Sequence, residues 1–282
     1  MKKITAVVVT YKRPDYLKKS LESMRKQAVL PDKIIVIDNS PGNETQRMIE
    51  EHFPFVGYRH FPDNIGSEGG FSEGIRLAYK DSDYVWLFDD DCISGKNALS
   101  ELIKWAEMLE KEAKVGAVRS ARPWDRRDDV PVLEIEDLIA WRGAMIFSEV
   151  VERVGLPEKD FFLYGGDIEY GLRIRKAGYR IYLVFSSKIN SLEYSKKIRR
   201  KFGRILTESY RQPFRIYYSY RNELWVHMKH KRYREVLKIV LCGLKNFCFH
   251  IFNGEVREAG AIIEGFGDAF RDRLGKHKKY LP

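Results

Sequence analysis

The sequence predicts an α/β fold in which helices flank an open sheet, followed by a basic, mainly helical C-terminal segment. Three observations support this. Apolar runs alternate with helical spacing over about the first 90 residues, the composition is 44% hydrophobic and 13% aromatic, and the excess of positive charge is C-terminal. A length of 282 residues is sufficient for one large α/β domain with an appended segment.

The strands of the first part are short apolar runs, as in a parallel sheet that is covered on both faces. We predict them at Ile4–Thr10, Lys33–Asp38, Val56–His60 and Tyr84–Phe88. Pro14 stands where helix starts tolerate proline, and the apolar residues after it have helical spacing. Because strands alternate with helices, ligands should gather at the carboxyl ends of the strands.

The pattern is less regular further along the chain. We predict a helix near Lys96–Lys111, strands near Val115–Ser120 and Leu138–Phe147, a helix from Asp167 to Lys176 and a final strand at Arg180–Val184. Gly178 lies between the last two elements, where glycine commonly ends a helix.

Charge divides the chain into two regions. Residues 196–282 contain 21 Lys and Arg against 8 Asp and Glu, a net charge of +13, whereas residues 1–195 carry −3. We therefore predict one domain over residues 1–195 and a basic, mainly helical segment over residues 196–282, with different roles.

The apolar stretch Val236–Phe252 in the basic segment is interrupted by Lys238, Lys245 and His250. It is shorter than the roughly 20 residues of a membrane-spanning helix, so we expect no span. Two interpretations stay open: a helix that lies in a membrane interface, and a helix that packs in a protein core.

The three cysteines, Cys92, Cys242 and Cys248, are odd in number and lack CxxC spacing. This disfavours a disulfide framework and a zinc site, and it fits a reducing cytoplasm. Met1-Lys2-Lys3 leads directly into the first strand, so we expect no secretory signal.

The acidic run Asp89-Asp90-Asp91 directly follows an apolar strand. On an extended backbone, Asp89 and Asp91 point to one side and Asp90 to the other, so the outer pair can hold a hard divalent cation. Magnesium or manganese bound there would bridge the protein to a diphosphate. The alternative is a solvated acidic turn that caps the following helix.

A glycine-rich loop, Gly66–Phe71, opens a helix whose N-terminus could favour phosphate, although a plain turn is an equal alternative. It matches neither GxGxxG nor GxxxxGK[ST], which disfavours a Rossmann dinucleotide site and a P-loop.

Asp167 and Glu169 follow a Gly-Gly turn, and one of them is placed to act as a general base. The alternative is that both are ordinary helix-start acids. Arg173, Arg175 and Arg221 could pair with a diphosphate, although most such arginines are surface residues.

Taken in order, these segments resemble the inverting glycosyltransferases of family 2, which have a GT-A fold with a Rossmann-like mixed sheet. The resemblance rests on six pieces: Val7–Ser23, Lys33–Thr45, Asp63–Ile75, Val85–Asp91, Trp141–Tyr179 and Tyr217–Asn222. The Asn64–Phe71 loop followed by three acids is most similar to the galactofuranosyl- and rhamnosyltransferase branches.

The resemblance implies a role for each matching residue. Asp167 would be the catalytic base, Asp89 and Asp91 the metal-binding pair, and Trp141 and Glu169 would lie on the acceptor side. The donor and its nucleotide would contact Thr10, Tyr11, Arg13, Asp38, Asn64, Gly69, Gly70, Asp89 and Asp90.

One feature departs from the family pattern. A metal-binding histidine is common about a dozen residues after the Gly-Tyr that closes the base helix, but Phe185–Tyr194 contains none. Asn190 or Ser191 stands nearest that position. Both are weaker ligands than imidazole for a transition metal, although oxygen suits magnesium.

By this resemblance, we expect inverting transfer of a sugar from a nucleotide-diphosphate donor, with UDP-galactofuranose or dTDP-rhamnose favoured. The acceptor would be a saccharide or lipid-linked saccharide in cell-surface polysaccharide synthesis, with Mg²⁺ or Mn²⁺ as cofactor. The basic segment could hold the enzyme to an anionic membrane from the cytoplasmic side.

Three alternatives remain. A weakened or non-catalytic sugar-nucleotide-binding protein fits the missing histidine. A nucleotidyltransferase would need a glycine-rich, lysine-bearing loop after Thr10, which is absent. Nucleic-acid binding is suggested by the basic tail with Tyr217, Tyr218 and Tyr220, but the acidic site argues against it, and we expect no nucleic-acid partner.

Overall fold

The computed structural model describes residues 2–125, 127, 129–136, 139–192, 197–201, 204–208 and 212–282. The chain forms two compact units. The first consists of Met1–Lys159 and Asp167–Leu192, and the second of Asp160–Gly166 and Glu193–Pro282. Each unit is described separately below.

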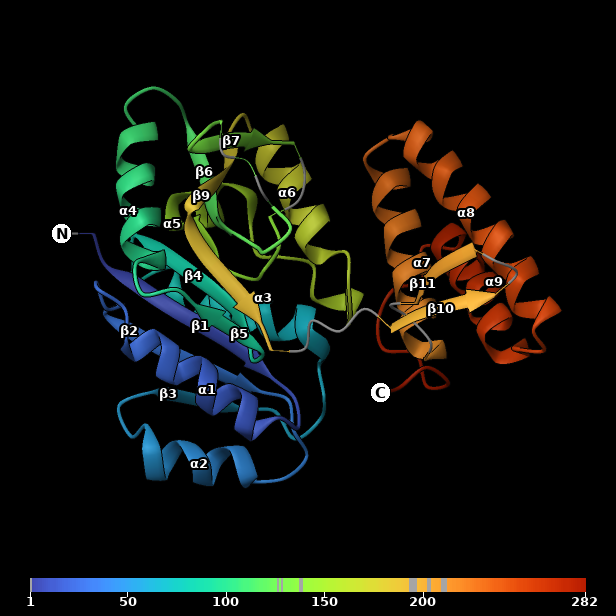
Figure 1. Ribbon diagram of the computed structural model, residues 1–282, viewed down its shortest axis with the longest axis horizontal. Helices are drawn as coiled ribbons and strands as arrows, with labels where there is room; N and C mark the ends of the chain where they lie inside the picture. The colour runs from blue at the N-terminus through green and yellow to red at the C-terminus, as the bar shows by residue number, and fades with distance from the viewer. Residues whose placement is uncertain are drawn as a thin grey trace. The chain divides into compact units, whose positions relative to one another are not determined.

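The first unit is built on a nine-stranded mixed sheet with the order β3-β2-β1-β4-β8-β6-β9-β5, in which β7 pairs with β9 (Figure 1). Its strands are β1 (Ile4–Thr10), β2 (Lys33–Asp38), β3 (Gly57–His60), β4 (Tyr84–Asp89), β5 (Cys92–Ser94), β6 (Val115–Ala121), β7 (Val132–Ile135), β8 (Ala144–Phe147) and β9 (Arg180–Ser191). The first four are mutually parallel, and β8 runs antiparallel to β4 and β6. This sheet confirms the expected mixed GT-A type architecture.

The register of the parallel strands brings their carboxyl ends to one edge. Thr10 at the end of β1 pairs with Asp38 at the end of β2, and Val9 pairs with Asp89 at the end of β4. Strands β1, β2 and β4 are almost wholly buried, with Trp86, Leu87 and Phe88 fully inaccessible, whereas β3 is half-buried. Burial on both faces explains why these strands are continuous apolar runs and why polar residues start only where each strand ends.

Helices flank the sheet. They are α1 (Pro14–Arg25), α2 (Glu44–His52), α3 (Gly66–Ala78), α4 (Ala98–Leu109), α5 (Ser148–Val154) and α6 (Gly166–Lys176), with a short 3₁₀ turn at Lys159–Phe161. Helix α3 packs on β1 and β2, and α4 packs on β6 and β9.

The glycines of the predicted loop lie inside helix α3, which begins at Gly66. A Cβ on Gly70 would stand 2.6 Å from Cγ1 of Val9, and one on Gly74 would stand 2.3 Å from Cγ1 of Val7. These glycines therefore let the helix lie close to β1, which is a packing role that the sequence pattern did not reveal.

Two other elements differ from the sequence prediction. Strand β8 begins at Ala144, because Ile139–Gly143 is a loop; Asp137 and Leu138 lie outside the described residues. Strand β9 extends to Ser191 instead of ending at Val184, because its second half pairs with β5. This extension brings Ser191 opposite Cys92, next to the acidic run.

The second unit contains the helices α7 (Pro213–Lys229), α8 (Tyr233–Phe252) and α9 (Val256–Phe270) and the antiparallel strands β10 (Lys197–Lys201) and β11 (Arg204–Glu208). Its core includes Tyr217, Tyr218, Leu224, Ile262 and Phe266. Among the described helices, none combines the length and the apolar character needed to cross a bilayer.

The short segment Asp160–Gly166 belongs to this unit because α7 holds it. The side-chain amide of Asn222 lies within 3.0 Å of the carbonyl oxygens of Phe161, Leu163 and Tyr164. The Arg221 guanidinium donates to the carbonyl oxygens of Phe161 at 2.9 Å and Gly275 at 2.7 Å. Both side chains are buried, so their role is to hold backbone and not to bind a diphosphate at the surface.

Candidate active site

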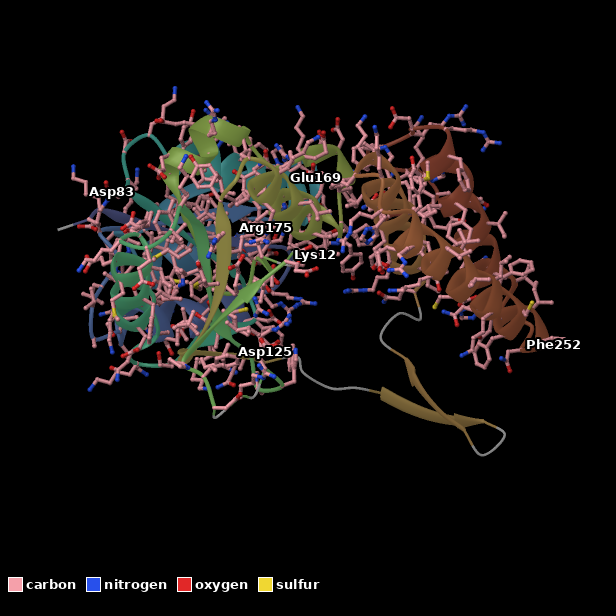
Figure 2. All side chains as sticks on the ribbon, turned by 90° about the horizontal axis from the view of Figure 1, so that it is seen from above. Lys12, Asp83, Asp125, Glu169, Arg175 and Phe252 are labelled. Atoms are coloured by element: carbon pink, nitrogen blue, oxygen red, sulfur yellow. The ribbon has the colours of Figure 1, made fainter. Side chains whose placement is uncertain are left out.

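The polar residues that follow the parallel strands lie at one end of the sheet. In Figure 2, Lys12, which follows β1, lies at the opposite end of the first unit from Asp83, which precedes β4. The end that carries Lys12 is the one where ligands bind in open α/β sheets.

Asp90 organises the residues that follow β1. Its carboxylate accepts a hydrogen bond from the Thr10 hydroxyl at 2.8 Å and lies 3.7 Å from the Arg13 guanidinium. The backbone N–H of Tyr11 points at the same carboxylate at 3.4 Å. Burial raises the pKa of Asp90 to about 7, although the charge of Arg13 and the hydroxyl of Thr10 lower it. Four of the residues predicted to contact the sugar donor therefore lie together.

Asp38, at the end of β2, is fully buried. One of its carboxylate oxygens accepts from the Tyr58 hydroxyl at 2.7 Å, and the other accepts from the backbone N–H of Ser40 at 2.9 Å. Both oxygens therefore fix the loop after β2, and a direct contact between Asp38 and a nucleotide stays a prediction.

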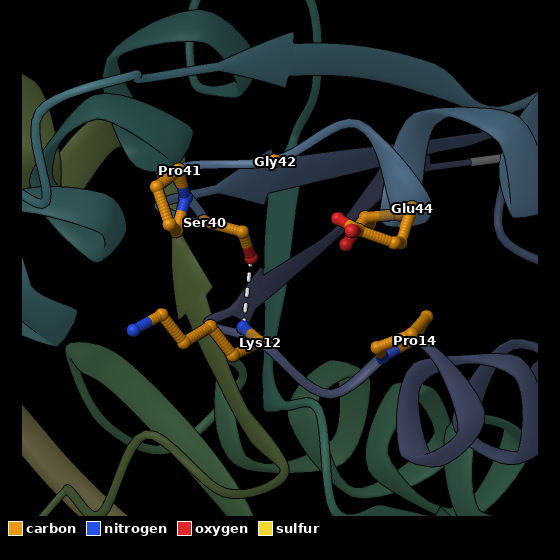
Figure 3. A pocket seen from close by; sticks show the side chains of 7 residues that line it. Lys12, Pro14, Ser40, Pro41, Gly42 and Glu44 are labelled. Carbon is orange, nitrogen blue, oxygen red and sulfur yellow. Dashed lines mark hydrogen bonds between the residues drawn. The ribbon is translucent and has the colours of Figure 1, made fainter.

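A pocket of ≈ 480 Å³ opens beside this loop and is lined by Lys12, Pro14, Ser40, Pro41, Gly42, Glu44 and Thr45. Lys12 has a positive φ of 56°, and its backbone N–H donates to the Ser40 hydroxyl at 2.7 Å, which ties the loops after β1 and β2 together (Figure 3). The pocket therefore lies where the two strands end, with an ammonium group and a carboxylate in its wall.

Asn64 caps the entry to α3, because its side-chain oxygen accepts from the backbone N–H of Gly66 at 2.8 Å. Gly69 and Gly70 are buried within the helix. The predicted contacts of these three residues with the sugar donor stay predictions.

Asp89 and Asp91 converge on one cation, the guanidinium of Arg142. Nε of Arg142 lies 2.7 Å from Asp89 and one of its terminal nitrogens lies 3.7 Å from Asp91. The charge of Asp89, above all, raises the pKa of Arg142. Burial and the charge of Asp91 raise the pKa of Asp89, against the opposing effect of Arg142. Oxygens of the two carboxylates lie within 4.8 Å of each other, so a divalent cation bound between them could contact both.

Asp91 is held by two further donors. Ser191 at the end of β9 donates its hydroxyl to Asp91 at 2.6 Å, and the Cys92 thiol lies 3.7 Å from the other oxygen. Burial, together with the charges of Asp89 and Asp91, raises the pKa of the Cys92 thiol well above its usual value. The Cys92 sulfur also lies within 4.8 Å of the two carboxylates, so these three residues form one group of potential ligand atoms.

Asp167 lies in the first turn of α6, where its carboxylate accepts from the backbone N–H of Ile168 at 3.0 Å. Burial raises the pKa of Asp167 to about 6 against the lowering effect of the Ile168 N–H, and the charge of Asp89 adds to the rise. The charge of Asp89 therefore affects the ionisation of Asp167, the predicted base. A carboxylate with a pKa near 6 is ionised at neutral pH and accepts a proton more readily than an ordinary aspartate.

The two predicted acceptor-side residues are both buried and both have partners. Glu169 pairs with Arg173 at 2.8 Å. The indole N–H of Trp141 donates to Glu68 at 2.9 Å, and its ring stacks on Phe71 with centroids 5.2 Å apart. Their contact with an acceptor stays a prediction.

Three residues of this region were not assigned a role from the sequence: Arg142, Glu68 and Lys12. Arg142 directly follows Trp141 in a segment that the resemblance includes, and Lys12 stands between two predicted donor residues. Their positions were therefore visible in the sequence. Their partners were not, because each pairs with a residue far away in the chain.

The chain belongs to glycosyl transferase family 2: the sequence profile of that family matches residues 5–154, which is more than half of the chain. The family resemblance inferred from the motifs is thereby confirmed.

Particular relatives can be named within that class. The chain is 28% identical over 201 residues to the galactofuranosyltransferase GlfT1 of Mycobacterium tuberculosis, covering 62% of this chain and 65% of that protein. It is 25% identical over 199 residues to GlfT1 of Mycolicibacterium smegmatis, covering 62% of this chain and 66% of that protein. The chain thus spans about two thirds of the length of these relatives.

Solved structures share the fold. GalNAc-T7, crystallised with UDP, GalNAc and Mn²⁺, superposes with a TM-score of 0.61 at 14% identity, covering 81% of this chain and 48% of that chain. TarS of S. aureus superposes with a TM-score of 0.52 at 15% identity, covering 67% of this chain and 36% of that chain.

Proposed function

We propose that the protein is an inverting, metal-dependent glycosyltransferase that uses a nucleotide-diphosphate sugar. The observation that carries this proposal is that Asp89 and Asp91 both face one cation, the Arg142 guanidinium. The charge of Asp89 also raises the pKa of Asp167, the candidate base. Family membership supports the class of reaction.

In the proposed mechanism, Asp89 and Asp91 would hold Mg²⁺ or Mn²⁺, and the bound metal would neutralise charge on the leaving diphosphate. Asp167 accepts the proton of an acceptor hydroxyl as that oxygen attacks the anomeric carbon. The attack comes from the face opposite the leaving diphosphate, so the configuration of the anomeric carbon is inverted. The hydroxyl of Ser191 keeps Asp91 in place. The nucleotide occupies the pocket between the loops after β1 and β2.

For the donor we favour UDP-galactofuranose over dTDP-rhamnose, because the relatives reported above are galactofuranosyltransferases. The acceptor would be a saccharide or a lipid-linked saccharide of a cell-surface polysaccharide.

A donor assay tests this proposal. The purified chain is incubated with Mn²⁺ and UDP-galactofuranose, UDP-galactopyranose or dTDP-rhamnose, and UDP or dTDP release is measured with and without saccharide acceptors. UDP-galactopyranose is the matched control, because it differs only in ring size. We expect turnover with the furanose alone. Nucleotide binding without release from any donor would favour the non-catalytic alternative.

We also propose that helix α8 docks on an anionic lipid surface. Seven of its exposed residues form one stripe along the helix, which we name the α8 stripe: Tyr233, Leu237, Leu241, Leu244, Cys248, Ile251 and Phe252. Phe252 is 89% exposed and Tyr233 is 70% exposed. Apolar residues that gather on one exposed face usually mark an interaction site.

Positive charge follows one edge of the α8 stripe and supports a lipid surface as its partner. Arg234, Lys238 and Lys245 are exposed, and each comes one residue after a member of the stripe, which places it about 100° further round the helix. Each basic residue near an anionic surface contributes about 1 kcal/mol of attraction. The opposite side of α8 is already used, because Val236, Val240 and Phe247 pack on the core of the second unit.

Vesicle sedimentation tests the α8 stripe in the full chain. We expect binding to vesicles that contain phosphatidylglycerol, weak binding to neutral vesicles, and loss of binding in Leu241→Glu/Leu244→Glu. Val29→Glu/Leu30→Glu is the control, since it places the same charges on an exposed apolar site of the first unit. Equal binding of both double variants would refute the proposal. Concentration-dependent dimers that only the α8 variant abolishes would identify a second copy as the partner instead.

A further inference from the structure

Arg142 occupies the space in which Asp89 and Asp91 would hold a cation. Its guanidinium contacts Asp89 at 2.7 Å and lies 3.7 Å from Asp91. The Asp91 side chain is 3% exposed, whereas the Arg142 side chain is 40% exposed. The carboxylate is therefore fixed within the protein, and the arginine can move toward solvent without disrupting the core.

The backbone that carries Arg142 is held on both sides. Before it, Trp141 is anchored by its hydrogen bond to Glu68 and by stacking on Phe71. After it, the N–H of Gly143 donates to the Leu87 carbonyl at 2.8 Å, and its carbonyl accepts from the N–H of Ser120 at 3.0 Å. Gly143 has a φ of +75°, a conformation that favours glycine. The position of Arg142 at the end of β4 is therefore set by the fold.

We propose that Arg142 is an internal cation that competes with the metal for Asp89 and Asp91 until a diphosphate offers it another partner. The carboxylates of Asp89 and Asp91, with oxygens within 4.8 Å of each other, repel when no cation lies between them, so the guanidinium stabilises the free protein. A divalent cation must displace it. Metal therefore binds weakly to the free protein.

A bound diphosphate relieves this competition, and this step rests on the proposed function. Arginine pairs readily with two phosphate oxygens because its donors form a planar fork. When Arg142 turns from Asp89 to the diphosphate, both carboxylates become available to the metal. Metal and donor then bind cooperatively, and Arg142 selects donors that carry a diphosphate.

The test measures Mn²⁺ binding by electron paramagnetic resonance, with and without UDP, for the wild type and Arg142→Gln. The control is Arg122→Gln. Arg122 also acts on this site, since its charge lowers the pKa of Asp167, but its ion-pair partner is Asp125. We expect Arg142→Gln to lower the Kd for Mn²⁺ without UDP by about tenfold, because a charge-assisted hydrogen bond no longer competes. UDP should strengthen Mn²⁺ binding far more in the wild type than in this variant.

Arg142→Lys gives a second measurement should the glutamine variant fail to fold, as judged by circular dichroism. Lysine keeps the positive charge but lacks the planar pair of donors, so the Kd of Arg142→Lys for Mn²⁺ should lie between those of the wild type and Arg142→Gln. The proposal is overturned if Arg142→Gln binds Mn²⁺ no more tightly than Arg122→Gln. If none of the proteins binds Mn²⁺ even with UDP, the metal site itself is refuted. If Mn²⁺ binds the wild type tightly without UDP, the metal site stands and the role of Arg142 fails.

Discussion

Asp167 is the residue whose ionisation most directly controls the proposed reaction. Burial and the charge of Asp89 favour its neutral form, so its pKa rises to about 6. The proposed role requires the ionised form. The carboxyl is protonated and inactive below this pKa, and ionised and active above it.

We therefore expect kcat/KM for transfer to fall about tenfold per pH unit below pH 6 and to be level from pH 7 upward. Asp167→Asn should lower kcat by about 10²- to 10⁴-fold and leave UDP binding intact. Steady-state kinetics across pH 4.5–8, with calorimetry for UDP, measures both effects. Near-normal turnover of Asp167→Asn would remove this residue from the mechanism.

At the scale of single residues, the sequence predicted the acidic residues of the candidate site but not their partners. Asp89, Asp91 and Asp167 stand beside strand and helix boundaries that the sequence marks clearly. The pairing of Asp91 with Ser191 spans 100 residues and depends on how far β9 extends. The pairing of Asp89 with Arg142 depends on the loop before β8, where the sequence predicted a strand. Such contacts follow from tertiary structure, which residue spacing does not specify.

Among the elements, α3 illustrates how tightly this fold packs its helices. The helix reaches β1 only because Gly70 and Gly74 lack side chains on the contact face. The sequence suggested a phosphate-binding loop for the same glycines, since both roles require a close approach of backbone to another group.

We expect Gly70→Ala to lower the free energy of unfolding by about 1–3 kcal/mol, because the new methyl group would overlap Val9. Gly260→Ala in α9 is the matched control. A Cβ there meets no atom within 4 Å, so alanine should stabilise that helix by about 0.5–1 kcal/mol. Urea denaturation followed by circular dichroism measures both. Restored stability in Gly70→Ala/Val9→Ala would establish overlap as the cause, and an unchanged Gly70→Ala would contradict it.

The parallel half of the sheet was predictable and the remainder much less so. Strands β1, β2 and β4 are buried on both faces, so each is an uninterrupted apolar run with a sharp polar end. Strand β9 alternates between buried and exposed residues in its second half, so its sequence lacks that signal. Pairing with β5 decides its length.

On the scale of the whole molecule, the division into two units does not follow the order of the chain. The chain passes from the first unit to the second at Asp160, returns at Asp167 and passes again after Leu192. The segment between the first two crossings contains two non-glycine residues with positive φ, Phe162 at 65° and Tyr164 at 62°. Such a conformation persists only when its surroundings hold it.

Asn222 provides much of that support, and we expect Asn222→Ala to lower the stability of the second unit by about 3 kcal/mol, since several buried carbonyl groups lose their donor. Asn246→Ala is the control, because that amide donates to two side chains, the Tyr220 hydroxyl at 2.6 Å and the Cys242 sulfur at 3.8 Å. Hydrogen exchange, read on peptides of each unit, locates the loss. Equal protection in both variants would show that the segment is held by other contacts.

The double crossing of the chain also determines how this protein can be recombined with its relatives. An exchange of C-terminal units that cuts only after Leu192 would leave Asp160–Gly166 of one parent facing the α7 helix of the other. Asp167 follows that segment directly, so a mismatch there would shift the proposed base. Asp160–Gly166 and α7 should therefore be inherited together, and insertions or breakpoints between homologous sequences should be rare within either of them.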